Sequence, residues 1–142
     1  MRMTHLLRLL VIVGLVVSFL GMHTTAARAS GLTFLVTLVN DGSDAHPGDG
    51  VCATSSGVCT LRAAIEEANA HAGADVIHFN LPGGGVHVMS ISSALPTITQ
   101  QLTLDGSSQP SCSVPCIVLS GALLTTGLQY GLTITTSNSL VK

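Results

Sequence analysis

The chain is poor in charged and aromatic residues. Of its 142 residues, 8% are charged and 3% are aromatic, and it has no tryptophan. After residue 29 the only lysine or arginine residues are Arg62 and Lys142, against seven acids, which gives a formal charge of −5. Two cations cannot neutralise many phosphates, so the composition argues against nucleic acid as a partner. Tyr130, the single tyrosine, offers no aromatic platform for stacking on sugar rings.

The chain also lacks an apolar run long enough for a comfortable transmembrane span. Leu9–Leu20 is almost entirely apolar, but a spanning helix needs about 20 such residues. This run follows two arginines and precedes Ala27-Arg28-Ala29, which is the n-region, h-region and A-x-A pattern of a secretory signal peptide. We predict that residues 1–29 are a signal peptide cleaved after Ala29, and that the mature protein is exported. An uncleaved membrane anchor is the alternative.

Four cysteines remain in the mature chain: Cys52, Cys59, Cys112 and Cys116. An even number of cysteines in an exported chain argues for disulfides. Of the three possible connectivities we favour the local one, Cys52 with Cys59 and Cys112 with Cys116, because each pair sits in one loop. A zinc site is the competing interpretation, but the C-x6-C and C-x3-C spacings do not match the usual C-x2-C ligand pattern.

One segment, residues 60–72, carries the signals of an α-helix. Thr60 is a suitable N-cap and Gly73 a suitable C-terminal stop. Five apolar residues form the stripe of one buried face: Leu61, Ala64, Ile65, Ala68 and Ala72. Arg62, Glu66 and Asn69 are expected on the opposite face. Arg62 is unfavourable in the first turn with respect to the helix dipole, so we expect compensation by Glu66 or by an acid in the preceding loop. A binding or catalytic role for Arg62 is the weaker alternative.

The residues before the helix predict a strand and a loop. Residues 31–40 are rich in β-formers and apolar on both faces, so we expect a first strand that is covered on both sides. Residues 40–50 are dominated by glycine, proline, asparagine and aspartate and form a loop. Asp41, Asp44 and Asp49 could ligate calcium there, although the spacing does not match the EF-hand pattern and ordinary turn formation is the preferred interpretation.

After residue 75 the pattern changes to short β-like runs separated by turn-formers. The runs are residues 76–79, 86–91, 101–104, 116–119 and 132–135. Their inward-facing apolar pairs recur every 12 to 15 residues, which is typical of a sandwich, a barrel or a solenoid. Two-residue inward pairs suit a β-solenoid best. Residues 131–142 begin a new apolar run without the polar cap that a solenoid end needs, which indicates a fragment of a longer chain or an open edge that meets a partner.

The sequence from Cys59 to Asn69, Cys-Thr-Leu-Arg-Ala-Ala-Ile-Glu-Glu-Ala-Asn, resembles the Cys-Ser-Leu-Arg-Glu-Ala-Ile…Ala-Asn motif of the CSLREA domain, found at the N-terminus of exported bacterial proteins. Residues 77–83 and 94–110 are similar to the continuation usual in that family, as are residues 131–134. The resemblance implies a mostly β chain that starts a right-handed parallel β-helix of the pectin-lyase-like type. Ala63 replaces the glutamate that would complete a capping box, which costs this helix a reciprocal hydrogen bond.

These observations predict three parts: the signal peptide 1–29, a strand, cysteine loop and capping helix at 30–75, and the first coils of a β-helix at 76–142. We expect a non-catalytic surface or secreted protein that serves adhesion or carbohydrate binding. The alternative is the N-terminal part of a polysaccharide lyase or glycoside hydrolase whose active site lies after residue 142. Among the residues present, Asp75 and Asp105 lie near the ends of predicted strands and could be proposed as a catalytic carboxylate pair, but Asp105-Gly106 is more simply a turn.

The histidines of the mature chain are the remaining candidates for chemistry. His46 lies in the acidic loop, His71 near the helix end, and His78 and His87 on or beside predicted strands. His78 and His87 could meet across coils and bind a metal, but local hydrogen bonds of surface histidines are the preferred interpretation. We therefore assign no catalytic, cofactor or metal residue from the sequence.

Overall fold

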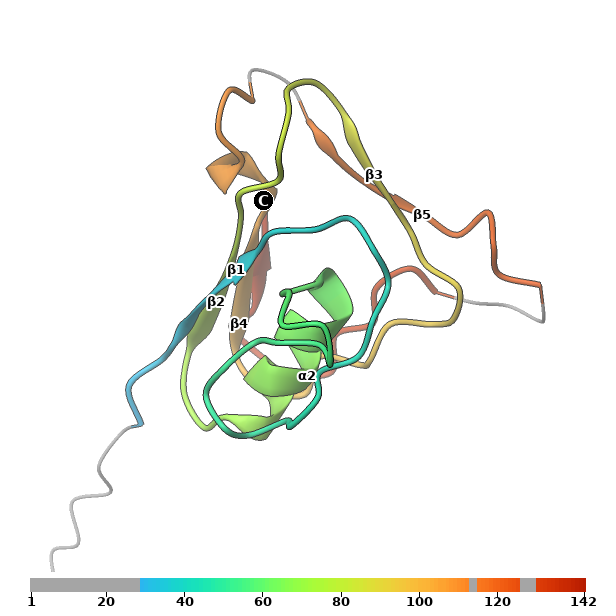
Figure 1. The fold of residues 1–142 in the computed structure, drawn as a ribbon. Coiled ribbons are helices and arrows are strands. Elements are labelled where there is room, and N and C mark those ends of the chain that lie inside the picture. Colours follow the sequence, from blue (N-terminus) through green and yellow to red (C-terminus); the bar gives the residue numbers. More distant parts are fainter. Residues whose placement is uncertain (1–28, 113–114, 126–129) are drawn as a thin grey trace, which may run out of the picture.

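The computed structural model describes residues 29–112, 115–125 and 130–142, so the predicted signal peptide lies outside the described residues except for Ala29. Within these ranges the chain forms one α-helix, one short 3-10 helix and six short strands (Figure 1). They are β1 (Thr33–Val36), α2 (Leu61–Ala70), β2 (Asp75–Phe79), β3 (His87–Ser90), β4 (Leu102–Asp105), η1 (Gly106–Ser108), β5 (Ile117–Ser120) and β6 (Leu140–Val141). No helix in the described ranges is long and apolar enough to cross a bilayer.

All strand pairings are parallel. One sheet has the order β1-β2-β4-β6 and a second pairs β3 with β5. Outside the two sheets, Ile98 and Ile134 form an isolated parallel bridge. This bridge pairs the segment between β3 and β4 with the segment between β5 and β6. Figure 1 shows β1, β2 and β4 along one side of the molecule and β3 and β5 along another, and α2 packs on β1 and β2. The prediction of a mostly β chain with one short helix is confirmed, and its strands run parallel.

Several boundaries differ from the expectations. The first strand is four residues long and is buried on one face only: Phe34 and Val36 are buried, whereas Leu35 is 44% exposed. The expectation that both faces are covered was wrong, because Leu35 lies on the outer face of the sheet. Residues 132–135 contribute the bridge at Ile134 rather than a strand.

The helix ends earlier than the expected residue 72. His71 is its C-cap, with its backbone N–H donating to Glu67, and the chain then turns through Gly73, whose φ is +152°, into β2. Ala72 therefore lies outside the helix and is exposed, so its assignment to the buried stripe was wrong. Leu61, Ala64, Ile65 and Ala68 do form the buried face.

The apolar core is dense beside α2 and opens away from it. Ile98 is 1% exposed, but Ile134, its neighbour in the parallel bridge, is 39% exposed. Leu104 is 8% exposed, and Val141, beside it on β6, is 51% exposed. The inward residues of β1, β2 and β4 are all at most 8% exposed, so burial is lost only at the last layer, at Ile134 and β6.

Side chains after β4 extend the hydrogen bonding of β2. The hydroxyl of Ser108 accepts from the backbone N–H of Phe79 at 2.8 Å. Gln109 is 4% exposed, and its side-chain amide pairs with both backbone groups of Leu81, at 2.8 and 3.0 Å. The pairing of β2 with β4 ends at His78 and Asp105, where η1 begins. Beyond that point these side-chain bonds hold the end of β2 and Leu81 against the segment after β4.

Candidate functional site

The most elaborate arrangement of polar side chains surrounds the N-terminus of α2. Thr60 is the N-cap: its backbone is extended, and its hydroxyl accepts from the N–H of Ala63 at 3.1 Å. The same hydroxyl donates to the carbonyl oxygen of Gly42 in the preceding loop. Thr60 is 1% exposed. The Thr60 hydroxyl therefore has two roles. It accepts a hydrogen bond from an amide of the first turn that has no partner within the helix, and it links the loop of residues 40–50 to the helix.

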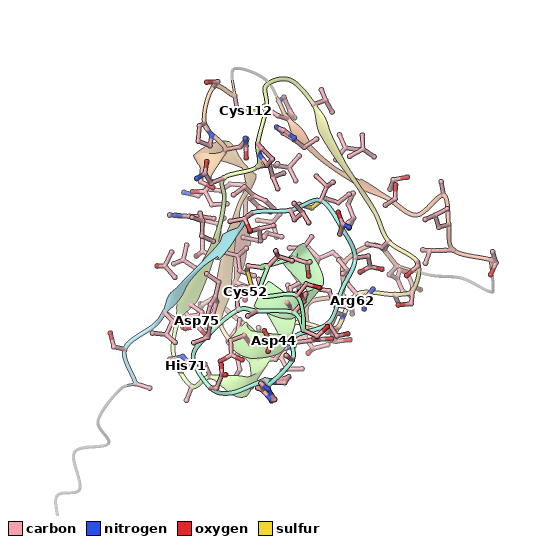
Figure 2. The ribbon with its side chains drawn as sticks, viewed as in Figure 1. Asp44, Cys52, Arg62, His71, Asp75 and Cys112 are labelled. Atoms are coloured by element: carbon pink, nitrogen blue, oxygen red, sulfur yellow. A yellow bond between two sulfur atoms is a disulfide. The ribbon has the colours of Figure 1, made fainter. Side chains whose placement is uncertain are left out.

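A disulfide joins Cys52 to Cys59 directly before this cap, and a second joins Cys112 to Cys116. This is the local connectivity predicted from the sequence. Figure 2 shows Cys52 close to the helix and Cys112 at a different corner of the molecule. The first disulfide closes a small loop, so its structural effect is to hold the chain where it enters the helix.

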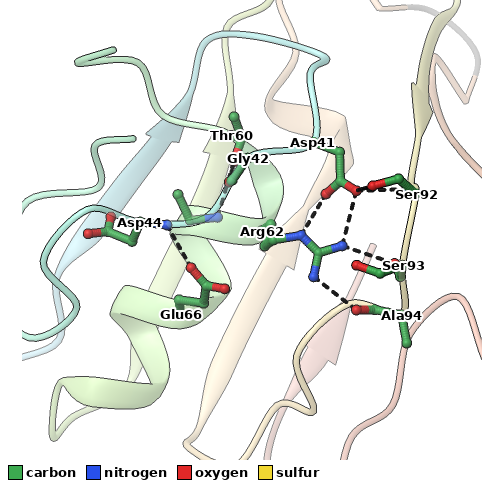
Figure 3. Close-up of polar contacts among 10 residues, drawn as sticks. Asp41, Gly42, Asp44, Thr60, Arg62, Glu66, Ser92, Ser93 and Ala94 are labelled. Atoms are coloured by element: carbon green, nitrogen blue, oxygen red, sulfur yellow. Dashed lines mark hydrogen bonds and ion pairs between the residues drawn. The ribbon is translucent and has the colours of Figure 1, made fainter. Parts of the chain in front are cut away.

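Arg62 makes the central contact of the site (Figure 3). Its Nε lies 2.7 Å from Asp41 Oδ1, and its Nη2 lies 3.1 Å from Asp41 Oδ2. The guanidinium also donates to the carbonyl oxygens of Ser93 and Ala94, each at 2.9 Å. The two paired side chains are 10% and 9% exposed. The sequence places Arg62 on the face opposite the buried stripe, yet its planar fork is itself buried, between the loop before the helix and the chain after β3.

Asp41 is the acid that compensates Arg62. Its Oδ2 also accepts from the backbone N–H and the hydroxyl of Ser92, each at 2.8 Å. Burial raises the pKa of Asp41, but the hydrogen bonds from Arg62 and Ser92 outweigh it, and the pKa lies below its ordinary value. The carboxylate thus stays ionised at neutral pH and joins three parts of the chain.

Two glutamates on α2 hold the rest of the loop. Glu67 is fully buried, and its two carboxylate oxygens accept from the backbone N–H groups of Gly48, at 2.6 Å, and Gly50. Both glycines have positive φ, +100° and +83°, which brings their amides toward the same side chain. Glu66 accepts from the N–H of Asp44 at 2.6 Å. The buried Glu67 was not identified from the sequence, because a glutamate in a helix ordinarily reads as a solvated residue.

The aspartates considered for calcium have other partners. Asp44 accepts from the backbone N–H groups of His46, at 2.8 Å, and Ala53, at 2.9 Å. Asp49 accepts from the N–H of Val51 at 2.8 Å, while Asp41 holds Arg62 as described above. In the part of the chain that the structure describes, no three histidine, cysteine or acidic side chains gather as a metal site. Asp44 and Asp49 thus order the loop through nearby backbone amides, whereas Asp41 joins the loop to Arg62 and Ser92.

Asn69 ties the helix to a further segment, the chain between β3 and β4. Its Nδ2 donates to the carbonyl oxygen of Thr97 at 2.8 Å, and its Oδ1 accepts from the N–H of Thr99 at 2.8 Å and from the Thr99 hydroxyl at 3.0 Å. The first layer of chain runs from β2 to Thr99. α2 packs on β1 and β2 and is hydrogen-bonded to residues 93, 94, 97 and 99, so it contacts this layer both at β2 and after β3.

The candidates for catalysis do not converge. Asp75 begins β2 beside Leu102, whereas Asp105 ends β4 beside His78, so the two carboxylates lie at opposite ends of neighbouring strands. Measured along the strands, the two positions are three residues apart, which is about 10 Å. Hydrogen bonds from Ser107 lower the pKa of Asp105 despite its burial, and contact with Lys142 adds to the effect. Asp105 is therefore held as an anion by its own turn.

The histidines also have separate neighbours. His78 Nε2 lies 3.9 Å from Asp105 Oδ2, and His87 Nε2 lies 3.4 Å from Gln109 Nε2. His71 Nδ1 lies 3.0 Å from Asp75 Oδ1. Each of these three histidines has its own neighbour, and none of the three contacts joins one histidine to another.

Comparisons with known proteins supply no further guide. No family model matches the chain, and searches of curated proteins and of solved structures find no match. The resemblance to the CSLREA domain thus rests on the sequence motif, and the argument for function rests on the geometry around α2.

Proposed function

We propose that this chain is the N-terminal end of an exported right-handed parallel β-helix, and that α2 with its loop closes that end. The whole protein would act at the cell surface or outside the cell, in adhesion or carbohydrate binding. The residues described here would serve the architecture rather than catalysis. The observation that carries the proposal is that one helix packs on β1 and β2 and is hydrogen-bonded both to the loop before it and to residues 93–99.

Parallel register supports the solenoid part of the proposal. Met89 lies beside Leu119, and Ile98 beside Ile134, so like residues stack in successive layers. A stack of this kind exposes unpaired strand edges and apolar side chains at both ends unless each end is covered. At the end near residue 60 the covering elements are α2, the disulfide loop and the glycine-rich loop that the helix holds.

The opposite end supports the expectation of further chain or a partner. An opening of about 180 Å³ reaches this end at Leu132 and Val141, and its lining continues inward to Phe79 and to Leu61 of α2. The side chains of Leu140 and Val141 on β6 are 50% and 51% exposed. An apolar opening at a strand edge suits another layer of parallel chain, which would add inward aliphatic residues and backbone hydrogen bonds in the same register.

The two disulfides support export. Disulfides persist in oxidising environments and are rare in reducing ones, so Cys52–Cys59 and Cys112–Cys116 fit an extracellular or periplasmic location. This agrees with the signal-peptide pattern before Ala29. The mass of the mature protein recovered after export tests this part directly, and we expect Ser30 as its first residue.

Hydrogen exchange tests the closing role of α2. In Arg62→Met the helix loses its bonds to residues 93 and 94, so the cap should open locally. We expect the amide of Ser92, which is bonded to Asp41, to exchange at least about tenfold faster, and the protein to bind more of an apolar dye. Lys142→Met removes a cation at the other end and is the matched control. If Ser92 exchanges at the same rate in both variants, α2 does not close the stack.

A further inference from the structure

The carboxylate of Asp75 is buried and incompletely paired. Its side chain is 0% exposed, and Oδ1 accepts from the backbone N–H of Leu32 at 2.7 Å and lies 3.0 Å from His71 Nδ1. Its Oδ2 is buried and has no hydrogen-bond partner among the described residues. A buried carboxylate oxygen without a donor is unfavourable, so this atom marks a place where a donor belongs.

The start of the mature chain passes directly beside this carboxylate. A Cβ added to Gly31 would come within 1.9 Å of the carbonyl oxygen of Ala74, so only glycine fits there. A Cβ added to Gly73 would come within 3.2 Å of the carbonyl oxygen of Ala29. Residues 29–32 therefore run tightly over the link between α2 and β2. In Figure 2, Asp75 and His71 lie beside this N-terminal segment.

We propose that the α-amino group of Ser30, released when the chain is cleaved after Ala29, pairs with the carboxylate of Asp75. The inference rests on the export processing that is part of the proposed function. Hydrolysis of the Ala29–Ser30 bond leaves a carboxylate on Ala29 and an amine on Ser30. In the precursor this nitrogen is a neutral amide with one hydrogen. In the mature protein it is an ammonium with three donors at neutral pH.

The geometry allows the ammonium to reach its partner. Ser30 precedes Leu32 by two residues, which span about 7 Å at most, and the N–H of Leu32 already donates to Asp75. Ser30 is exposed, so its new end can rotate. Removal of Ala29 also takes its carbonyl oxygen away from Gly73, while Gly31 stays beside it. Cleavage thus supplies a cation to a carboxylate that the fold has buried, and the junction of β1, α2 and β2 becomes firmer in the mature protein than in the precursor.

A four-protein comparison tests the pairing. The mature protein that begins at Ser30 is compared with the same protein acetylated on its α-amine, each with Asp75 and with Asp75→Asn. We expect acetylation to raise the unfolding equilibrium constant in urea about tenfold with Asp75, and less than about twofold with Asp75→Asn. An equal effect in both backgrounds, or none in either, would overturn the pairing.

A second measurement needs no variant, so it remains decisive if Asp75→Asn fails to fold. Cyanate carbamoylates a free α-amine, and we expect the Ser30 amine to react about tenfold more slowly in the folded protein than in urea-unfolded protein. Equal rates would overturn the pairing. An exported protein that begins at another residue would overturn the processing step. Neither result bears on the closing role of α2, which is tested on Arg62→Met.

Discussion

Replacement of Arg62 by methionine should lower the free energy of unfolding by about 3–5 kcal/mol, the cost of removing one partner of a buried ion pair. Methionine matches the length of the stem but leaves Asp41 as a buried carboxylate without its cation. It also leaves the carbonyl oxygens of Ser93 and Ala94 without these donors. Little of the effect should be lost to solvent screening, because the paired side chains are only 10% and 9% exposed.

Urea unfolding of a double-mutant cycle measures this energy. The cycle combines Arg62→Met with Asp41→Asn, and we expect the double variant to lose less than the sum of the single losses, with a coupling energy of about 1–3 kcal/mol. Arg62→Lys keeps the charge but not the planar fork, so it should recover only part of the stability. Lys142→Met, whose side chain is 50% exposed, is the control and should lose less than about 1 kcal/mol. A loss below about 1 kcal/mol in Arg62→Met would refute the reasoning, because it would mean that the pair is solvated.

The pH dependence of the same cycle follows from Asp41. Its pKa is lowered in the folded protein from the ordinary value of 3.8. The stability that it contributes is therefore fully present above that value and is lost as the pH falls through the lower, folded-state pKa. The excess stability of the wild-type protein over Arg62→Met should stay constant from about pH 7 to pH 5 and shrink below about pH 4. An excess that is unchanged at low pH would contradict the assignment of the ion pair.

Three further predictions concern burial, space and hydrogen bonding, each measured by urea unfolding. Ile98→Ala should cost about 2–5 kcal/mol, whereas Ile134→Ala, at the stacked position, should cost less than about 1 kcal/mol; equal losses would contradict the open end. Gly31→Ala should cost about 3 kcal/mol or more, since its Cβ would come within 1.9 Å of a backbone oxygen, while Gly84→Ala, with no atom within 4 Å, should change little. Glu67→Gln should cost about 1–3 kcal/mol, because an amide presents only one acceptor to two backbone donors; an unchanged stability would show that the glycine loop does not depend on it.

Local signals predicted the helix and the strands well. Thr60 as N-cap, the apolar stripe and the change of period after residue 75 are short-range properties. The structure has a helix at residues 61–70 and strands in four of the five runs predicted after residue 75, the exception being residues 132–135. Alternate residues of the first of these runs, Ile77 and Phe79, are 0% and 2% exposed and face inward, whereas Ile134 in the last run is 39% exposed. Such features follow from side chains within a few residues of one another, so a sequence carries them directly.

The polar contacts of the cap could not be predicted in the same way. Arg62 reads as a solvated residue, and its burial depends on Ser93 and Ala94, which are 31 and 32 residues away in the chain. Gln109 is similar, since its partner Leu81 is 28 residues away. A buried polar side chain produces no periodic pattern in the sequence. Its partner depends on which strands pair and in which register, and the sequence analysis does not determine that pairing.

The hydrogen bonds that α2 makes with the loop before it and with residues 93–99 join parts of the chain that are close in sequence, and this affects the order of folding. Asp41 and Arg62 are 21 residues apart, Asn69 and Thr99 are 30 apart, and Arg62 and Ala94 are 32 apart. Every bond that seals the first layer is therefore available once residue 99 has emerged from the ribosome or the export channel. Loops of this size close at a modest entropic cost, and domains tend to fold from the N-terminus as they emerge. The sealed layer can then act as the template on which each later strand pairs, so the direction of synthesis and the direction of growth of the stack coincide.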